Sequence, residues 1–307
     1  VVFNLRTIIK NLAFCKKDIL NFKPDVIVLI DYPGFNIRIA KWAHHQGIKV
    51  VYYISPQVWA WKENRVKTLK ASVDRMLVIL PFEKEFYRSW NWEVDYVGHP
   101  LVEVVESFKK EHPGILRDEM LVAILPGSRK QEILKKLPVM LEATKHFPGY
   151  QFVVAKAPGL SAAFYNEMLK AWPNVRWVEN KTYHLLAEAR AALVTSGTAT
   201  LETALFDVPQ VICYKGSNVS YQIAKRLVKI RFIGLVNLIM NKEVVKELIQ
   251  NEMNVENIVS ELKPLLTETD KRKYILDEYD ALRKLLVEGG DASANAAKEI
   301  IDLLSIK

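Results

Sequence analysis

The sequence predicts an α/β protein made of two similar halves, each with a parallel β-sheet. Short apolar runs rich in β-branched residues alternate with helical patterns along most of the chain, an order typical of βαβ units. The length of 307 residues suggests about two domains. A charged, turn-prone stretch separates the two sets of units.

The first half begins with an amphipathic helix over residues 1–21. The run Pro24–Asp31 is short, apolar and β-branched, as expected for a buried parallel strand. A helix over 37–46 and a strand over 49–54 follow, which implies right-handed crossovers. The other elements expected here are strands at 76–81 and 94–97 and a helix that starts at Phe82.

The second half extends the same pattern. Its expected strands cover residues 121–125, 151–155, 175–178, 192–195 and 209–214. Helices are expected after Arg129, at 158–171 and 183–189, after Thr198, at 220–229, over most of 242–288 and at 293–304. Residues 232–238 are predicted to be a loop.

These patterns set the expected domain boundaries. A partial first domain covers residues 1–105, a linker 106–118 and a second domain 119–288. A last helix lies in 289–307, after the break at Gly289 and Gly290. The chain has no initiator Met and opens inside an apolar, basic pattern, so we expect residues before Val1 in the natural protein.

Composition favours an anionic partner. The formal net charge is +8, which suits nucleic acid, anionic lipid or a phosphorylated substrate; the alternative is that the charge serves solubility alone. Cys15 and Cys213 lie far apart and fit a reduced cytosolic protein without disulfides or a cysteine-based metal site. No apolar run reaches the ~18 residues that a membrane-spanning helix needs, and no signal peptide is recognisable.

One stretch, Ala191–Leu205, carries the clearest site pattern. It predicts a buried strand, a polar turn of Ser196, Gly197 and Thr198, and a helix. The glycine lets backbone N–H groups approach a ligand, and a helix start favours an anion such as phosphate. Thr198 and Glu202 share a helix face, and the carboxylate suits ribose hydroxyls. The alternative is an ordinary helix cap.

A second turn of this kind follows the strand 121–125. Gly127 and Ser128 offer backbone donors at a helix start, and Arg129 offers a guanidinium fork for phosphate or carboxylate. The patterns GxxxxGK[ST] and GxGxxG are both absent, so neither a Walker A loop nor a dinucleotide-binding loop is predicted.

Four further residues are candidates with alternative readings. Asp31 follows a strand and is a general base, a cap of the next helix or a solvated residue of the loop. His99 contacts substrate or makes a structural hydrogen bond. Trp59, with Trp61 and basic residues, lines an apolar mouth or stacks on nucleic acid. Asn237, in an apolar stretch, is a loop staple or a ligand contact.

Seven segments together resemble the lipid A disaccharide synthase family, whose members are inverting glycosyltransferases with the B-type fold of two Rossmann-like domains. Each segment alone is weak, but they occur in order over nearly the whole chain. They are LIDYPGFN (29–36), YYISPQVWAWKENRV (52–66), LPFEKEFY (80–87), VGHPL (97–101), LPGSR (125–129), TSGTATLE (195–202) and KRLVK…NL (225–238).

The resemblance implies a reaction. UDP-2,3-diacylglucosamine donates its sugar to 2,3-diacylglucosamine 1-phosphate (lipid X), which gives a β-1,6-linked disaccharide 1-phosphate and UDP. Asp31, Arg129 and Asn237 match residues important for catalysis. Gly127, Ser128, Ser196, Gly197 and Thr198 would hold phosphate, Glu202 the ribose, and His99 and Trp59 other parts of the substrates. No metal or other cofactor is expected.

The resemblance also implies a location and an assembly. The family's membrane-contacting patch maps to Val1, Val2, Leu5, Ile8 and Ile9, so peripheral contact with the cytoplasmic leaflet of the inner membrane of a Gram-negative bacterium is expected. From the residues alone, this helix could instead simply pack on the sheet. A homodimer that exchanges C-terminal segments is a further expectation, with Gly289–Gly290 as hinge.

One departure from the family concerns the start of the chain. The family begins with a Gly-rich strand and loop carrying Gly-Glu-x-Ser-Gly-Asp, and this sequence starts after it. The first strands of the sheet and part of the acceptor pocket are therefore expected to be missing. Rival functions are another UDP-sugar enzyme of this fold, such as a UDP-N-acetylglucosamine epimerase or a peptidoglycan glycosyltransferase, and a basic nucleic-acid-binding protein.

Overall fold

The computed structural model describes residues 5–217, 221 and 230–305. The chain forms two compact units. Unit 1 comprises residues 1–100 and 286–307, and unit 2 comprises residues 101–285. The last segment of the chain therefore returns to the unit in which the chain began.

Unit 1 is built on a four-stranded parallel sheet with the order β1-β2-β3-β4. The strands are β1 (Val26–Ile30), β2 (Lys49–Tyr53), β3 (Arg75–Val78) and β4 (Asp95–Tyr96). The helices are α1 (Leu5–Phe22), α2 (Pro33–His45), α3 (Arg65–Lys70), α4 (Pro81–Arg88) and α14 (Ala292–Ser305). Each of α2, α3 and α4 connects one strand to the next.

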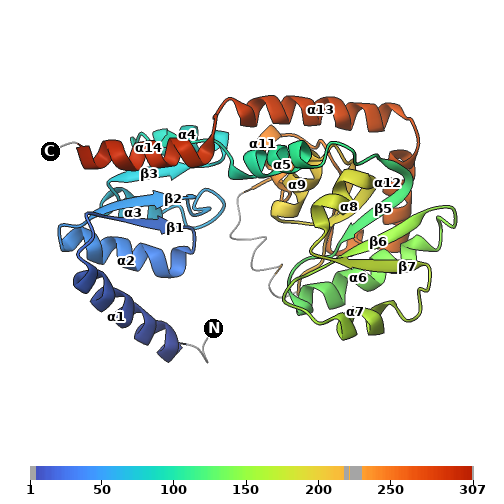
Figure 1. The fold of residues 1–307 in the computed structure, drawn as a ribbon, viewed down its shortest axis with the longest axis horizontal. Helices are drawn as coiled ribbons and strands as arrows, with labels where there is room; N and C mark the ends of the chain where they lie inside the picture. The colour runs from blue at the N-terminus through green and yellow to red at the C-terminus, as the bar shows by residue number, and fades with distance from the viewer. Residues whose placement is uncertain (1–4, 218–220, 222–229, 306–307) are drawn as a thin grey trace. The chain divides into compact units, whose positions relative to one another are not determined.

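Alternation along the strands divides the apolar side chains of unit 1 between two layers. Val50 and Tyr52 of β2 pack in one cluster with Ile39, Ala40 and other residues of α2. Val51 packs in another, with Leu77 of β3 and with Ala296 and Leu303 of α14. Figure 1 shows α2 and α14 on opposite sides of this sheet.

Glycine residues contact one another closely at the point where the chain returns to unit 1. A Cβ atom on Gly289 would lie 2.5 Å from Gly98 Cα, and one on Gly98 would lie 2.7 Å from Gly290 O. No other residue type fits such an approach without a backbone shift. The Gly289–Gly290 break is a tight packing point, after which α14 packs on β3. Exchange of C-terminal segments between protomers with this break as hinge stays a prediction.

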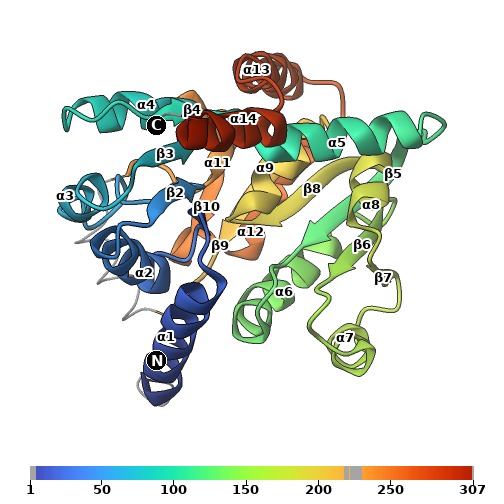
Figure 2. The ribbon, with the colours of Figure 1, turned by 60° about the vertical axis from the view of Figure 1, so that its left-hand side comes forward.

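Unit 2 is built on a six-stranded parallel sheet with the order β10-β9-β8-β5-β6-β7 (Figure 2). The strands are β5 (Asp118–Leu125), β6 (Gln151–Lys156), β7 (Val175–Glu179), β8 (Ala189–Thr195), β9 (Gln210–Tyr214) and β10 (Glu247–Ile249). Every residue of β8 is buried, because a central parallel strand is covered on both faces. This explains the continuous apolar run in its sequence.

The strand order of unit 2 reverses between β5 and β8. From β5 the chain moves outward through β6 to β7, and it then returns to β8 and continues to β9 and β10 on the other side. Right-handed crossovers therefore put the connecting helices on different faces. In Figure 1, α6 (Lys130–Thr144) and α7 (Ala162–Leu169) lie on one face, and α8 (Thr182–Glu188) and α9 (Thr198–Leu205) on the other.

The remaining helices of unit 2 cover its sheet and its ends. They are α5 (Pro100–Glu111), whose first residue belongs to unit 1, α11 (Leu235–Met240), the short 3₁₀ helix η2 (Gln250–Glu252), α12 (Val255–Leu266) and α13 (Asp270–Val287), whose last two residues belong to unit 1. α12 packs against α6 and β8, and α11 packs against α9.

The structure confirms the α/β class and the parallel sheets, and it corrects the sequence-based elements at three places. Residues 106–118, expected to be a linker, contain the second half of α5 and the start of β5. Residues 232–238, expected to be a loop, contain the start of α11. The stretch 242–288, expected to be helical, contains β10 after a short loop. The helix expected at 220–229 lies outside the described residues, apart from Tyr221.

Candidate functional site

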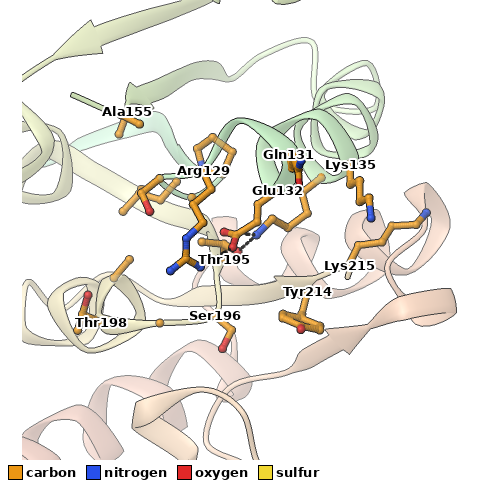
Figure 3. A pocket seen from close by; sticks show the side chains of 18 of the residues that line it. Arg129, Gln131, Glu132, Lys135, Ala155, Thr195, Ser196, Thr198, Tyr214 and Lys215 are labelled. Atoms are coloured by element: carbon orange, nitrogen blue, oxygen red, sulfur yellow. Dashed lines mark hydrogen bonds and ion pairs between the residues drawn. The ribbon is translucent and has the colours of Figure 1, made fainter. Parts of the chain in front are cut away.

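A cavity of about 750 Å³ lies in unit 2, at the carboxyl ends of β6, β5, β8 and β9. This is the point where the strand order reverses, and open parallel sheets bind ligands there. We call it the unit 2 cavity. Its walls are residues 125–129, 131–132, 135–136, 155–158, 182, 195–199, 202 and 214–217, several of which Figure 3 shows.

The loop after β5 brings backbone close to the end of β8. Gly127 has φ +113, and a Cβ atom there would lie 3.3 Å from both Thr195 Cγ2 and Glu132 Oε2. A side chain at this position would therefore combine backbone strain with crowding. The sequence placed Gly127 and Ser128 in such a turn, and both line the cavity.

The turn after β8 has a second glycine with unusual backbone angles. Gly197 precedes α9 with φ 142 and ψ −164, a region that only glycine occupies readily. Nothing lies within 4 Å of where its Cβ atom would be. Thr198, the first residue of α9, is exposed on the cavity wall. The first N–H groups of a helix have no partner within it, so this open turn can accept an anion.

The hydroxyl of Ser196 has a different role from the one predicted. Its Oγ donates a hydrogen bond to Ile233 O at 2.7 Å, so the proton expected to be free for phosphate is already engaged. The bond ties the turn to the segment before α11. Ser196 lines the cavity, but its side chain can offer a ligand only an acceptor while this bond is present.

A cluster of charges lies beside these loops (Figure 3). Arg129 Nη1 donates to Glu132 Oε1 at 2.9 Å, and Lys136 Nζ lies 3.6 Å from Glu132 Oε2. Arg129 is 81% exposed, whereas the Lys136 side chain is 2% exposed. The arginine therefore remains accessible to an incoming anion, as the sequence predicted. Glu132 and Lys136 are four apart on α6, a spacing that could have flagged the pair.

Glu202 lies on the cavity wall one turn into α9, as its spacing from Thr198 predicted. Tyr183 Oη donates to Glu202 Oε1 at 2.9 Å. Burial raises the pKa of the Glu202 carboxyl, and the tyrosine bond opposes that rise. Each carboxylate oxygen can accept more than one hydrogen bond, so the group can still accept from a hydroxyl pair.

Asp31 lies at the corresponding edge of unit 1, directly after β1. Asp31 and Tyr32 both have left-handed backbone angles, with φ 46 and φ 43. Tyr52 Oη donates to Asp31 O at 2.6 Å, and Asn36 Nδ2 donates to the same oxygen at 2.9 Å. Two consecutive non-glycine residues in this region are strained, and such strain concentrates at functional sites.

The Asp31 side chain itself is exposed. Its carboxylate has no hydrogen-bond partner among the described residues. The residue before α2 is Tyr32, and it makes no side-chain cap. The helix-cap alternative for Asp31 therefore has no support in these contacts. An exposed carboxylate fits both a general base, which must be accessible, and a solvated residue of the loop.

Trp59 is a structural residue, contrary to the prediction that it binds substrate. It is 8% exposed, and its indole N–H donates to Glu83 Oε1 at 3.0 Å. Its ring packs edge-to-face on Phe82 with centroids 5.0 Å apart. Trp61 is the accessible tryptophan of this loop, and Lys62 Nζ lies 4.3 Å from its ring centre.

Sequence reasoning missed Glu83, which holds this loop. The carboxyl is 1% exposed and accepts from Trp59 Nε1 and from the N–H groups of Ile79 and Leu80. Burial raises its pKa to about 7. The signal was available: a glutamate at the third position of a helix often accepts from the backbone at the helix start.

His99 is a buried residue of unit 1. It is 4% exposed, and burial lowers its pKa to about 4, so the ring is neutral near pH 7. It is not among the cavity-lining residues. Of its two readings, burial therefore favours the structural one over a phosphate contact.

Of the two alternatives for Asn237, the structure supports the one in which its side chain holds a loop in place. It is fully buried, its Nδ2 donates to Val245 O and Glu247 Oε1, and its Oδ1 accepts from the N–H groups of Val244 and Val245. These bonds occupy the amide, so the catalytic role suggested by the resemblance has no support here. Glu247 also accepts from Ile233 and Gly234, which fixes the segment that Ser196 contacts.

The membrane patch lies only partly within the described residues. Val1 and Val2 lie outside them, as does the side chain of Leu5. Ile8 is half-buried, and Ile9 is 56% exposed. Within the described part of the chain, no helix has the length and apolar content to span a membrane.

Comparisons with solved structures match this architecture. CalG4, the calicheamicin glycosyltransferase, superposes with a TM-score of 0.62 at 16% identity, over 99% of this chain and 81% of that one. A UDP-GlcNAc 2-epimerase from Neisseria meningitidis, solved with UDP-GlcNAc, superposes with a TM-score of 0.59 at 14% identity, over 98% and 81%. At such identity the likeness establishes the fold alone.

Sequence comparisons are more specific. The family model described as lipid-A-disaccharide synthetase matches residues 1–301. The lipid-A-disaccharide synthase of Syntrophus aciditrophicus is 42% identical over 307 residues, covering 96% of this chain and 80% of that protein. The synthase of the same name from Coxiella burnetii is 39% identical over 295 residues, covering 92% and 76%.

The fold is that of the B-type glycosyltransferases and the sugar-nucleotide epimerases related to them, and the site is a cationic cavity at the switch point of a parallel sheet. Among proteins of this class, the chain belongs to the lipid-A-disaccharide synthetase family. It is a glycosyltransferase of lipid A biosynthesis.

Proposed function

We propose that this protein transfers the 2,3-diacylglucosamine group of UDP-2,3-diacylglucosamine to the 6-hydroxyl of 2,3-diacylglucosamine 1-phosphate. The products are the β-1,6-linked disaccharide 1-phosphate and UDP. In this proposal unit 2 holds the nucleotide and unit 1 supplies the base and contacts the acceptor. Family membership supports the reaction, and the unit 2 cavity is the observation that carries the assignment of roles.

The diphosphate is assigned to the two turns of the cavity. Ser128 and Thr198 are exposed on its wall, and Gly127 and Gly197 let the backbone approach a ligand closely. Arg129 supplies an exposed guanidinium, which can pair with two phosphate oxygens at once. Helix starts and arginine together stabilise negative charge on a departing diphosphate.

The ribose is assigned to Glu202. Its carboxylate lies on the same wall as Thr198, and Tyr183 occupies only part of its accepting capacity. A carboxylate that accepts from a vicinal hydroxyl pair selects a ribonucleotide over a deoxyribonucleotide. The nucleotide is thus fixed at both its sugar and its phosphates.

Asp31 is assigned the base. Its carboxylate accepts the proton of the acceptor 6-hydroxyl while that oxygen forms a bond to the anomeric carbon. The bond from that carbon to the UDP oxygen breaks, and its electron pair leaves with the diphosphate. Attack from the side opposite the leaving group inverts the anomeric centre. The fixed, strained backbone at Asp31 supports this role, because it limits the positions that the carboxylate can take.

We also propose that unit 1 contacts the cytoplasmic leaflet of the inner membrane through α1. This helix exposes Ile9, Phe14, Leu20 and Phe22, with exposed fractions from 49% to 81%. Lys10 and Lys17 are exposed on the same helix. Apolar and basic side chains together favour binding to an anionic lipid surface, which is where substrates with acyl chains would be found.

The test is a transfer assay with the purified protein, radiolabelled UDP-2,3-diacylglucosamine and lipid X. We expect a labelled disaccharide 1-phosphate and one UDP per product. Absence of the disaccharide would refute the proposed reaction. The same incubation without lipid X separates the main rival, because an epimerase would convert a UDP-sugar without any acceptor.

A further inference from the structure

Lys136 links the two turns of the unit 2 cavity from behind. Its Nζ donates a hydrogen bond to Thr195 Oγ1, at the last residue of β8. The same nitrogen lies 3.4 Å from where a Cβ atom on Gly127 would be, in the loop after β5. The ammonium group therefore contacts the end of β8 and lies close to the loop after β5.

The burial of this lysine works against stability. Its side chain is 2% exposed, and removing an ammonium group from water is expensive. Burial accordingly lowers the pKa of Lys136, whereas Glu132 raises it. An apolar side chain of similar length would fill such a site at no electrostatic cost. Stability alone therefore gives no reason for a lysine at this position.

The charges around Lys136 do not balance. Within the described part of the chain, Lys136 pairs with one carboxylate, that of Glu132, and Arg129 shares it. Thr195 contributes no charge. Cys213 lies nearby and is fully buried, and burial raises the pKa of its thiol to about 12, so it is neutral. Two cations thus share one anion, and the cluster lies beside a cavity with open backbone donors.

We propose that Lys136 is a positioning residue for the diphosphate of the bound nucleotide. It holds the loop after β5 against the end of β8, and its charge makes the potential in the cavity positive from behind the loops. The diphosphate supplies the negative charge that the cluster lacks. This role rests on the proposed function of the cavity as a UDP site.

The experiment compares two ligands that differ only in the phosphates. UDP binding to the whole protein is measured by calorimetry, and uridine binding by ligand-observed NMR titration. For Lys136→Met we expect the Kd for UDP to rise about tenfold, in line with the loss of one charge-assisted contact. The Kd for uridine should stay within about twofold, because no phosphate is involved.

A matched control removes another lysine of the same region. Lys145, directly after α6, is 58% exposed, pairs with Glu142 at 2.7 Å and does not line the cavity. Lys145→Met should bind both ligands as the unaltered protein does. Circular dichroism and thermal unfolding establish that each variant is folded.

Thr195→Val provides a second variant if Lys136→Met does not fold. It keeps the shape and the lysine but removes the oxygen that accepts from Nζ, so UDP should bind several-fold more weakly and uridine normally. Wild-type UDP affinity in the folded variants would overturn the role of Lys136, as would equal losses for UDP and uridine. If the unaltered protein fails to bind UDP, the proposed function itself fails.

Discussion

At the carboxyl edge of the six-stranded sheet, polar and charged side chains surround a cavity of about 750 Å³. At the same edge of the four-stranded sheet, Trp59, Glu83 and His99 are buried in packed structure, and Asp31 is an exposed carboxylate without a partner among the described residues. Both edges are made by parallel strands and short loops. The edge in unit 2 presents cations and backbone donors, whereas the edge in unit 1 presents an exposed carboxylate.

The two edges differ in the residue types that adopt positive φ angles in the loops of the candidate site. In unit 2, glycines at positions 127 and 197 open the turns after β5 and β8, so that main-chain donors and an arginine line the cavity. In unit 1, the non-glycine residues Asp31, Tyr32 and Ile54 take left-handed angles after β1 and β2. The first arrangement favours binding of an anion, and the second fixes a single side chain in place.

The largest effect is expected at Asp31. Asp31→Asn removes the base, so the rate of sugar transfer should fall by a factor of ~10²–10⁴, while UDP affinity stays unchanged. Steady-state transfer assays and calorimetry measure the two quantities. The matched control is Asp25→Asn, an exposed carboxylate just before β1. A variant at Asp31 that transfers sugar at the normal rate would end its assignment as base.

The next effect tests the open turns of unit 2. Gly127→Ala places a Cβ atom 3.3 Å from Thr195 and Glu132 at φ +113, which costs about 1–3 kcal/mol in strain. We expect UDP affinity to fall by about tenfold or more. The control is Gly159→Ala, because nothing lies within 4 Å of a Cβ atom there. Equal UDP affinity in the two variants would contradict the close backbone approach.

A smaller loss is expected from the exposed cation. Arg129→Ala should weaken UDP binding by about tenfold, the value of one charge-assisted contact, with little effect on thermal unfolding because the side chain is 81% exposed. Calorimetry at low and high salt measures it. Lys170→Ala, an exposed residue after α7, is the control. Wild-type affinity in Arg129→Ala would remove the arginine from the phosphate site.

The last prediction concerns the pH dependence of stability, and it belongs to unit 1. The folded pKa of Glu83 is about 7, above its usual value of 4.5, so its contribution is present below pH 4.5 and is lost as the pH rises through 7. The folded pKa of His99 is about 4, below its usual value of 6.5, so its contribution is present above pH 6.5 and is lost as the pH falls through 4. Each is worth about 3 kcal/mol at most.

These two contributions oppose each other between pH 4.5 and 6.5. Glu83→Gln should therefore leave unit 1 gaining stability as the pH rises through this window. A His99→Asn variant should show the reverse. Urea unfolding followed by tryptophan fluorescence at several pH values measures both slopes. Parallel slopes in the two variants would show that these groups do not control the pH dependence.

The sequence by itself determined the strands other than β10, the two glycine turns and the charged loop. Runs such as Leu121–Leu125 are apolar because central parallel strands are buried on both faces. Each such run lies within a few consecutive residues, so the strand can be predicted from the sequence. Gly127, Arg129, Thr198 and Glu202 all line one cavity, as their spacing after strands predicted. The family followed from motifs spread over the chain.

Tertiary structure alone decided which polar groups remain available. Trp59 and Asn237 have the side-chain chemistry of ligand contacts, but Glu83 and Glu247 engage them from elsewhere in the chain. In the sequence, Lys136 looks like an ordinary lysine of a helix. Only the fold shows that its ammonium group lies behind two loops of the cavity. Burial and hydrogen-bond pairing depend on partners distant in sequence, so composition and periodicity cannot specify them.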